Sequence, residues 1–313
     1  MDARQRQVRS LSGVPVAADF YAIDGTPVVV NRTKGSEGIY ILNDSDEIIE
    51  LMSAIPFELR VPKGDVSGYG AVNKFGHAPS GAQTTATDIW DRADATPTQQ
   101  IWVAPTQARV HAIASSSDVD GKTGAPTSAG ARTVQITGLT TWGTAESSET
   151  VTLDGTTPVN TANSYVIIHR MKVLTAGTTN INVGTITATA ATDSSVTAAI
   201  RPSQGQTAMA IYGVPSTQKF YMTKLIASLN DNTAQTRLDM KLLVNESPDV
   251  SPLNVRFIDK SEFMIQNSGS SYVERSFEPY PAFAGPCIIK IQCVSSAADI
   301  DCYGAFDGYL VTN

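Results

Sequence analysis

The stretch Gly130–Leu174 reads GARTVQITGLTTWGTAESSETVTLDGTTPVNTANSYVIIHRMKVL and carries the densest strand and turn signals of the chain. In its first part, Val134 and Ile136 are separated by one polar residue. This is the two-residue period of a strand with one face on a core and one in water. Residues 149–153 repeat it. The stretch therefore predicts antiparallel β structure, and it contains no catalytic motif.

A turn signal, Asp154-Gly155, follows the second of these strands. Both residues tolerate the positive φ of tight hairpin turns, so we expect residues 152–153 to turn back on residues 157–159. The next strand, 165–174, has a Val166-Ile167-Ile168 centre that needs cover on both faces. Such a unit predicts a β-sandwich, which is a platform more often than a catalyst.

The N-terminal third has weaker patterns. After a polar arm we expect short strands at 27–30 and 38–42, and either helical turns or a further strand at 44–52. Residues 61–100 are rich in Gly, Pro, Ser and Thr, with isolated large side chains that include Tyr69, Phe75 and Trp90. These three are candidate anchors into pockets of another protein. The alternative is a long loop pinned onto its own domain, and the sequence leaves both open.

From residue 100 onward, short strands follow one another with turn residues between them, and no helical period intervenes. Pro202–Gln206 is the best linker candidate. The predicted fold class is all-β, with two tandem antiparallel β-sandwich or jelly-roll domains preceded by an extended N-terminal arm. The expected divisions are 1–95 for the arm and anchoring region, 96–203 for the first sandwich and 204–313 for the second.

Composition narrows the possible partners. Charged residues make up 17% of the chain, and the net charge of −7 argues against a nucleic-acid partner, because affinity for phosphates comes from clustered Lys and Arg. The N-terminus is polar and no apolar run approaches the length of a membrane span, so we expect no signal peptide and no membrane partner. The expected place of synthesis is a cytoplasm.

The sequence offers no recognisable chemistry. His77, His111 and His169 are scattered without a second ligand at metal spacing, so we expect no metal and no cofactor. Asp118 and Asp120 resemble a fragment of a calcium loop, but the remaining ligand positions do not fit, and a solvated turn is the favoured interpretation. The prediction is a protein that is not an enzyme.

Three cysteines, Cys287, Cys293 and Cys302, lie near the C-terminus. An odd number gathered at one end is a poor disulfide framework and favours reduced, buried side chains. A hairpin near residues 296–299 would nevertheless bring Cys293 and Cys302 face to face, so their oxidation state stays open.

Aromatic residues concentrate in the same region. They are more numerous than one sandwich face needs for its core, so some are expected to face outward and to hold a homo-oligomer. Stacking against a sugar ring is the alternative role. The candidate oligomer contacts are Phe277, Tyr280, Phe283, Phe306 and Tyr309.

Three motifs carry a resemblance: ARTVQITGL at 131–139, SETVTLDGTTPV at 148–159, and AVNKFG at 71–76 followed by Asp88-Ile89-Trp90-Asp91. Together they resemble a group of bacteriophage virion structural proteins. The resemblance implies a capsid-decorating or head-attached component in the virion, assembled in the host cytoplasm. Its implied partners are further copies of itself, most simply as a trimer, and the major capsid protein or a tail or portal component. A tail or tail-fibre protein that binds a host receptor or glycan, and a depolymerase or other hydrolase, are the alternatives.

Overall fold

The computed structural model describes residues 56–82, 84–92, 99–121, 129–230, 236–250, 256–266 and 270–313, with the backbone alone at 80–82 and 270, and the backbone of five short strands before residue 56. The chain forms two compact units, Met1–Gly70 and Ala71–Asn313. Its regular structure is almost entirely antiparallel β, as the sequence predicts.

In the first unit, β1 (Val8–Arg9) pairs with β2 (Pro15–Val16). The strands β3 (Val29–Asn31), β4 (Gly38–Leu42) and β5 (Ile48–Ser53) form an antiparallel sheet, so the open choice at 44–52 resolves as a strand. The helix α1 (Phe57–Lys63), which the sequence does not predict, ends at Gly64 in the left-handed conformation. The polar arm expected before residue 27 lies largely outside the described residues.

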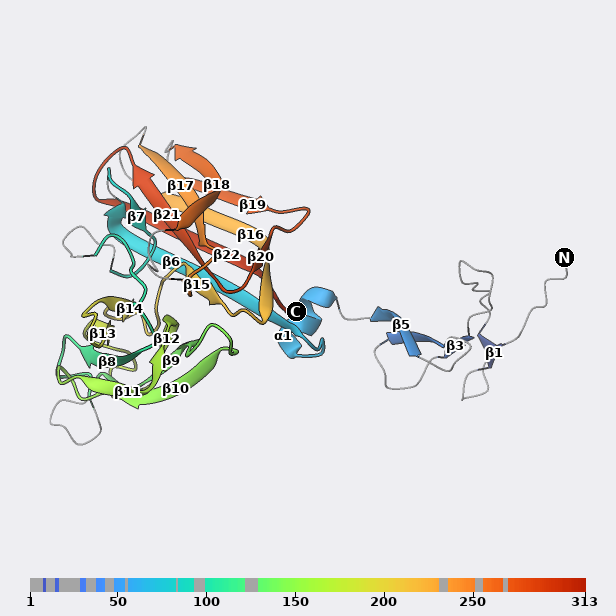
Figure 1. Cartoon of the computed structure of the whole chain (residues 1–313), viewed down its shortest axis with the longest axis horizontal. Coiled ribbons are helices and arrows are strands. Elements are labelled where there is room, and N and C mark those ends of the chain that lie inside the picture. The colour runs from blue at the N-terminus through green and yellow to red at the C-terminus, as the bar shows by residue number, and fades with distance from the viewer. Residues whose placement is uncertain are drawn as a thin grey trace. The chain divides into compact units, whose positions relative to one another are not determined.

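The stretch Gly130–Leu174 contributes strands to two sheets (Figure 1). One has the order β10-β9-β12, and the other has the order β11-β8-β13-β14. Their strands are β8 (Arg109–Ser115), β9 (Ala131–Leu139), β10 (Ser147–Thr152), β11 (Val159–Tyr165), β12 (Ile167–Ala176), β13 (Ile186–Ala190) and β14 (Val196–Ile200).

The predicted turn at Asp154-Gly155 is confirmed, but the predicted hairpin is wrong. Gly155 has a φ of 63°, and the Thr157 amide donates to the Asp154 carbonyl at 3.1 Å. However, β10 pairs with β9 whereas β11 pairs with β8, so the chain changes sheet at this turn. The cause is the loop after β8, because the Gly155 amide donates to the Asp120 carbonyl and the Ser115 amide donates to the Gly155 carbonyl.

The C-terminal strands form two further sheets, with the orders β15-β21-β17-β18 and β19-β16-β22-β6 (Figure 1). The short strands β7 and β20 pair with β21 and β16. The bounds are β6 (Tyr69–Ala82), β7 (Thr87–Asp88), β15 (Ile211–Val214), β16 (Gln218–Asn230), β17 (Arg237–Asn245), β18 (Phe257–Gln266), β19 (Ser270–Ser276), β20 (Ala282–Ala284), β21 (Cys287–Ser295) and β22 (Ile300–Thr312).

β6 is the main departure from the sequence prediction. Residues 69–82 form a strand of 14 residues beside β22, where an extended polar segment is expected. Because the second compact unit begins at Ala71, the later part of the region assigned to the arm, 1–95, lies in this unit instead. The prediction fails because an edge strand can carry many small and polar residues when its neighbour supplies the hydrogen bonds.

A β-bulge adjusts the long strand β16 to its neighbour. Phe220 and Met222 are buried, then the register against β22 shifts, and Leu225 continues the buried face in the opposite parity. Extra residues of this kind keep one face on the core where strict alternation would turn it outward. On β22 the alternation is unbroken from Ile300 to Leu310.

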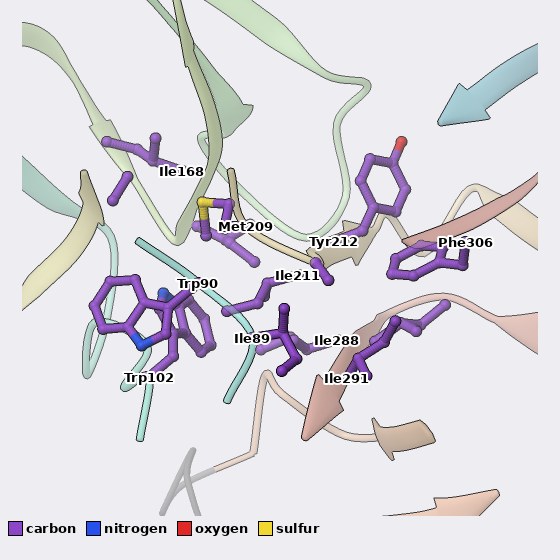
Figure 2. Packing of buried hydrophobic residues seen from close by; sticks show 14 of the residues in the cluster. Ile89, Trp90, Trp102, Ile168, Met209, Ile211, Tyr212, Ile288, Ile291 and Phe306 are labelled. Atoms are coloured by element: carbon purple, nitrogen blue, oxygen red, sulfur yellow. The ribbon is translucent and has the colours of Figure 1, made fainter. Parts of the chain in front are cut away.

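One hydrophobic cluster runs through the second unit and joins the strands before residue 203 to those after it (Figure 2). Trp90 and Trp102, from the segment before β8, belong to the same cluster as Ile168 of β12 and Ile288 of β21. Residues before and after position 203 therefore belong to one compact unit.

Candidate functional site

The segment Thr87–Asp91, here called the strap, is buried throughout. The Asp88 carboxylate accepts hydrogen bonds from Lys290 Nζ at 2.6 Å, from the Trp102 amide at 2.8 Å and from Gln292 Nε2 at 2.8 Å. Lys290 is also nearly inaccessible, and a buried ion pair requires this degree of hydrogen bonding to offset its desolvation. Asp88 therefore ties the strap to β21 and to the Trp102 segment.

The strap's backbone pairs on two sides. The Ile89 amide donates to the Ile291 carbonyl at 3.0 Å, and the Ala210 amide donates to the Ile89 carbonyl at 3.0 Å. A Cβ added to Gly76 of β6 would lie 2.6 Å from the Ile89 carbonyl oxygen and 2.5 Å from the Ala210 nitrogen. Only glycine allows β6 to approach the strap this closely.

Asp91 completes the strap. Its carboxylate accepts the Ala208 amide at 2.6 Å and lies 3.8 Å from the Arg201 Nε. Burial raises the pKa of this carboxyl to about 8, although the Ala208 hydrogen bond and the positive charges of Arg201 and Lys74 oppose the shift. The strap thus fastens the segment between β14 and β15 to the rest of the unit.

A polar pocket of about 420 Å³ lies beside β6. Lys74 Nζ donates to the His169 carbonyl, and His169 Nε2 is 2.7 Å from Glu146 Oε2. Burial, together with the nearby Arg170, lowers the pKa of Lys74 to about 7, while Glu146 and Asp91 oppose the shift. Burial also lowers the pKa of His169, while Glu146 opposes that shift. These contacts connect β6 to β12 and to the loop before β10.

The sequence analysis does not single out Lys74, and it treats His169 only as an isolated histidine. A signal for Lys74 exists in the AVNKFG motif, because Val72, Lys74 and Gly76 alternate with outward-facing residues and share a face of β6. A lysine on the inner face of a strand indicates a buried polar contact. Glu146 has no such signal, since it lies in an irregular loop.

The three candidate anchoring residues lie in different environments. Trp90 is fully buried in the chain's own core, which leaves none of its side chain for another protein. Tyr69 is 41% exposed and packs edge-on against the Phe57 ring, and Phe75 is 37% exposed. The structure does not bring the three together, and only Tyr69 and Phe75 offer surface to a partner.

The five candidate oligomer contacts also differ in their burial. Phe306 is fully buried and Phe283 is nearly so, and both pack against Phe220 of β16. Tyr280 is 48% exposed, whereas Phe277 and Tyr309 are half-buried. Alternation along β22 separates the buried Phe306 from Tyr309. It gives no guidance for Phe277 and Tyr280, because the segment 277–281 follows no strand alternation.

A groove of about 640 Å³ opens beside three of these residues. Its lining includes the buried Phe283 and the exposed Tyr280. The Arg275 guanidinium lies 5.0 Å from the centre of the Phe277 ring, a cation–π distance. This site, here called the aromatic groove, is lined by Leu242, Glu246, Lys260, Ser261, Glu262, Arg275, Phe277, Pro279, Tyr280, Pro281, Ala282 and Phe283.

The favoured interpretation of Asp120 as part of a solvated turn is wrong. Its side chain is fully buried and accepts bonds from Ser115 Oγ and from the backbone amides of Ala131, Val183 and Gly184, all at 2.7 to 2.8 Å. Asp118, on the surface, instead accepts hydrogen bonds from Thr156. Asp120 organises the loop after β8 because one carboxylate satisfies three buried amides.

Within the part of the chain that the structure describes, no three His, Cys, Asp or Glu side chains are grouped so that they could hold a metal ion. Among the same residues, no helix has the length and apolar character needed to cross a membrane. All three cysteines are free and buried.

No protein-family model matches the chain, and no curated protein matches it. Among solved structures, one similar chain comes from the structure of infectious bursal disease virus Gt strain. It is 9% identical, with 82% of this chain and 78% of that chain covered, and the TM-score is 0.17. A score this low does not establish a common fold.

Proposed function

We propose that this chain is a non-enzymatic structural component of a bacteriophage virion, most simply a capsid-decorating or head-attached protein. One observation supports a structural role above all. The polar residues of the Asp88-Ile89-Trp90-Asp91 motif are buried and hold the chain to itself, with Asp88 bonded to Lys290 and Asp91 to Ala208. Residues used in this way stabilise a platform, and their carboxylates are not exposed to a substrate.

The finer fold proposed is a pair of β-sandwiches. Tyr212 of β15 and Phe220 of β16 have ring centres 6.2 Å apart, although the two strands belong to different sheets. Ile291 of β21 and Gly304 of β22 are also close across the two sheets, because a Cβ added to Gly304 would lie 3.0 Å from Ile291 Cδ1. Such contacts between the inner faces of two sheets support a sandwich.

Attachment to the particle is assigned to the N-terminal region, with the exposed Tyr69 and Phe75 as contacts. The partner would be the major capsid protein or a tail or portal component. Self-association, most simply as a trimer, is assigned to the C-terminal sheets. Support comes from exposed apolar side chains on the edge strands β18 and β19, namely Ile258, Met264 and Tyr272.

The aromatic groove favours a second candidate, a tail or tail-fibre component that binds a host glycan. An exposed ring such as Tyr280 can stack on a sugar, and the neighbouring Glu262 and Arg275 can bond its hydroxyls. Purified chain would be titrated with host surface polysaccharide. Binding that Tyr280→Ala abolishes would favour this candidate over the first.

A reconstruction of the virion that contains the chain tests the main proposal. The expected result is density matching residues 71–313 on the outer surface of the head, around a three-fold position. Density at the tail tip would replace the head assignment with the tail one. Specific cleavage of host polysaccharide by the purified chain would contradict the non-enzymatic role.

A further inference from the structure

Two thiols are in contact inside the C-terminal sheets. Cys293 Sγ lies 3.6 Å from Cys302 Sγ, and both side chains are fully buried. Cys293 lies opposite Met240 in the sheet of β21, whereas Cys302 lies opposite Leu229 in the sheet of β22. The pair therefore connects two different sheets across the core.

The chain itself holds the two thiols together. β21 and β22 are consecutive, and the turn between them lies at the surface, with Ser296 and Asp299 exposed. The Ser296 amide donates to the Arg237 carbonyl at 2.8 Å, which fixes the start of the turn. The contact between Cys293 and Cys302 is therefore supported by a short connection as well as by packing.

We propose that Cys293 and Cys302 form an intramolecular disulfide when the protein meets a low-molecular-weight disulfide, and that this bond latches the two sheets together. The thiolate of one cysteine attacks a sulfur of the small disulfide and releases one small thiolate. The second cysteine, as thiolate, attacks the mixed disulfide and releases the other. Two protein thiols are oxidised, one small disulfide is reduced to two thiols, and the two protons pass to the leaving groups.

The buried environment of the two thiols also controls the rate at which the disulfide forms. The hydrogen bond with Cys302 and burial both raise the pKa of Cys293 well above its ordinary value. Because the thiolate is the attacking form and both sulfurs are buried, oxidation requires a transient opening of the core and is slow at neutral pH and faster in alkali. The protein would therefore stay reduced in the cytoplasm where it is made, and would gain the bond slowly in an oxidising medium.

Cys287 provides an internal control. It lies at the opposite end of β21, opposite Val214 of β15, and burial raises the pKa of its thiol to about 12. It should stay reduced under conditions that oxidise the pair. The variant Cys287→Ser leaves only the two thiols of the proposed disulfide.

The test incubates the purified full chain with oxidised glutathione at alkaline pH, stops the exchange with acid and removes the glutathione, then denatures the chain and counts free thiols. The expected count falls from three to one in the wild type, with a mass loss of two hydrogens, and from two to none in Cys287→Ser. Three thiols that persist, or a mass increase from glutathione adducts, would overturn the proposal. The oxidised protein should also melt roughly 5 to 10 °C higher than the reduced one. An unchanged or lower Tm after the bond forms would refute the proposal that the disulfide holds the two sheets together.

Discussion

The strap and the aromatic groove contain the same kinds of residue, aromatic rings beside paired charges, but in opposite environments. In the strap, Trp90 is fully buried and Asp88 bonds three donors from other segments. In the groove, Tyr280 is 48% exposed, and the ion pair of Lys260 with Glu246 in its lining is partly exposed to solvent. Aromatic residues in a sequence therefore do not by themselves mark an interface.

The difference in burial between the strap and the groove should affect the free energy of unfolding. A buried charge that loses its partner stays in a medium of low polarity, whereas an exposed charge is solvated by water. Substitutions in the strap should therefore reduce the free energy of unfolding, and substitutions in the groove should alter association instead. The predictions below test this contrast, beginning with the largest expected effect on stability.

Replacement of Trp90 by Ala removes the largest side chain of the strap from a fully packed site. We expect the free energy of unfolding to fall by about 3 to 5 kcal/mol, because the cavity cannot close. Urea denaturation monitored by circular dichroism measures it. Trp90→Phe, which keeps an aromatic ring, should cost clearly less, and equal losses for the two variants would contradict the packing argument.

Replacement of Asp88 by Asn removes the carboxylate charge and leaves Lys290 buried without its counter-charge. The expected loss is about 3 kcal/mol. The double variant Asp88→Asn with Lys290→Met should recover part of it, because no unpaired charge remains. A double variant as unstable as the sum of the single ones would show that the pair itself is not the source of the effect.

Asp91 predicts a pH dependence. Its pKa is raised from 3.8 to about 8 in the folded chain, so the folded state holds a proton that the unfolded state has lost between these values. The stability that this proton contributes is present below pH 3.8 and is lost as the pH rises to about 8. Asp91→Asn removes the dependence.

The measurement is the difference in unfolding free energy between Asp91→Asn and the wild type at several pH values from 4 to 7. This range lies below the interval from about 7 to 10.5 in which the lowered pKa of Lys74 makes the chain more stable as the pH rises. The difference should grow with pH in favour of the Asn variant, by at most about 1.4 kcal/mol per pH unit. A constant difference would show that Asp91 is ionised throughout.

The smallest effect on stability is expected for exposed rings. The double variant Tyr272→Ser with Tyr280→Ser should change the free energy of unfolding by less than about 0.5 kcal/mol. It should nevertheless convert a trimer to monomers in sedimentation at micromolar concentration. Phe306→Ser, in the core, should instead destabilise the chain without acting directly on the association surface. A wild-type chain that is strictly monomeric would defeat the assignment of this surface to self-association.

Local periodicity predicts much of the β structure. The alternation at Val134 and Ile136 locates β9, and Asp154-Gly155 locates a tight turn, because both depend on neighbouring residues alone. The pairing of β11 with β8 was not predictable in this way. It depends on hydrogen bonds between Gly155 and the distant Asp120 and Ser115, which no local pattern reports.

The candidate sites likewise depend on contacts between residues that are distant in the sequence. Sequence identifies Trp90 and Phe306 as large apolar residues, but their burial depends on strands far away in the chain. Lys74, Glu146 and His169 meet only because β6 lies beside the sheet of β12, and β6 itself lacks a strong strand pattern. The proximity of Cys293 and Cys302 was foreseeable, since one turn separates their strands. The hairpin expected there is wrong, however, because β21 and β22 belong to different sheets and the thiols meet across the core.

Quantitative mass spectrometry of purified virions tests the proposed role most directly. Particles would be purified through a density gradient, and peptides of this chain would be counted against those of the major capsid protein. The account predicts that the chain is present in a fixed ratio, with a copy number that is a multiple of three, and that it stays with the particles through the gradient. Absence of the chain from purified particles, while it is abundant in the infected cell, would contradict it.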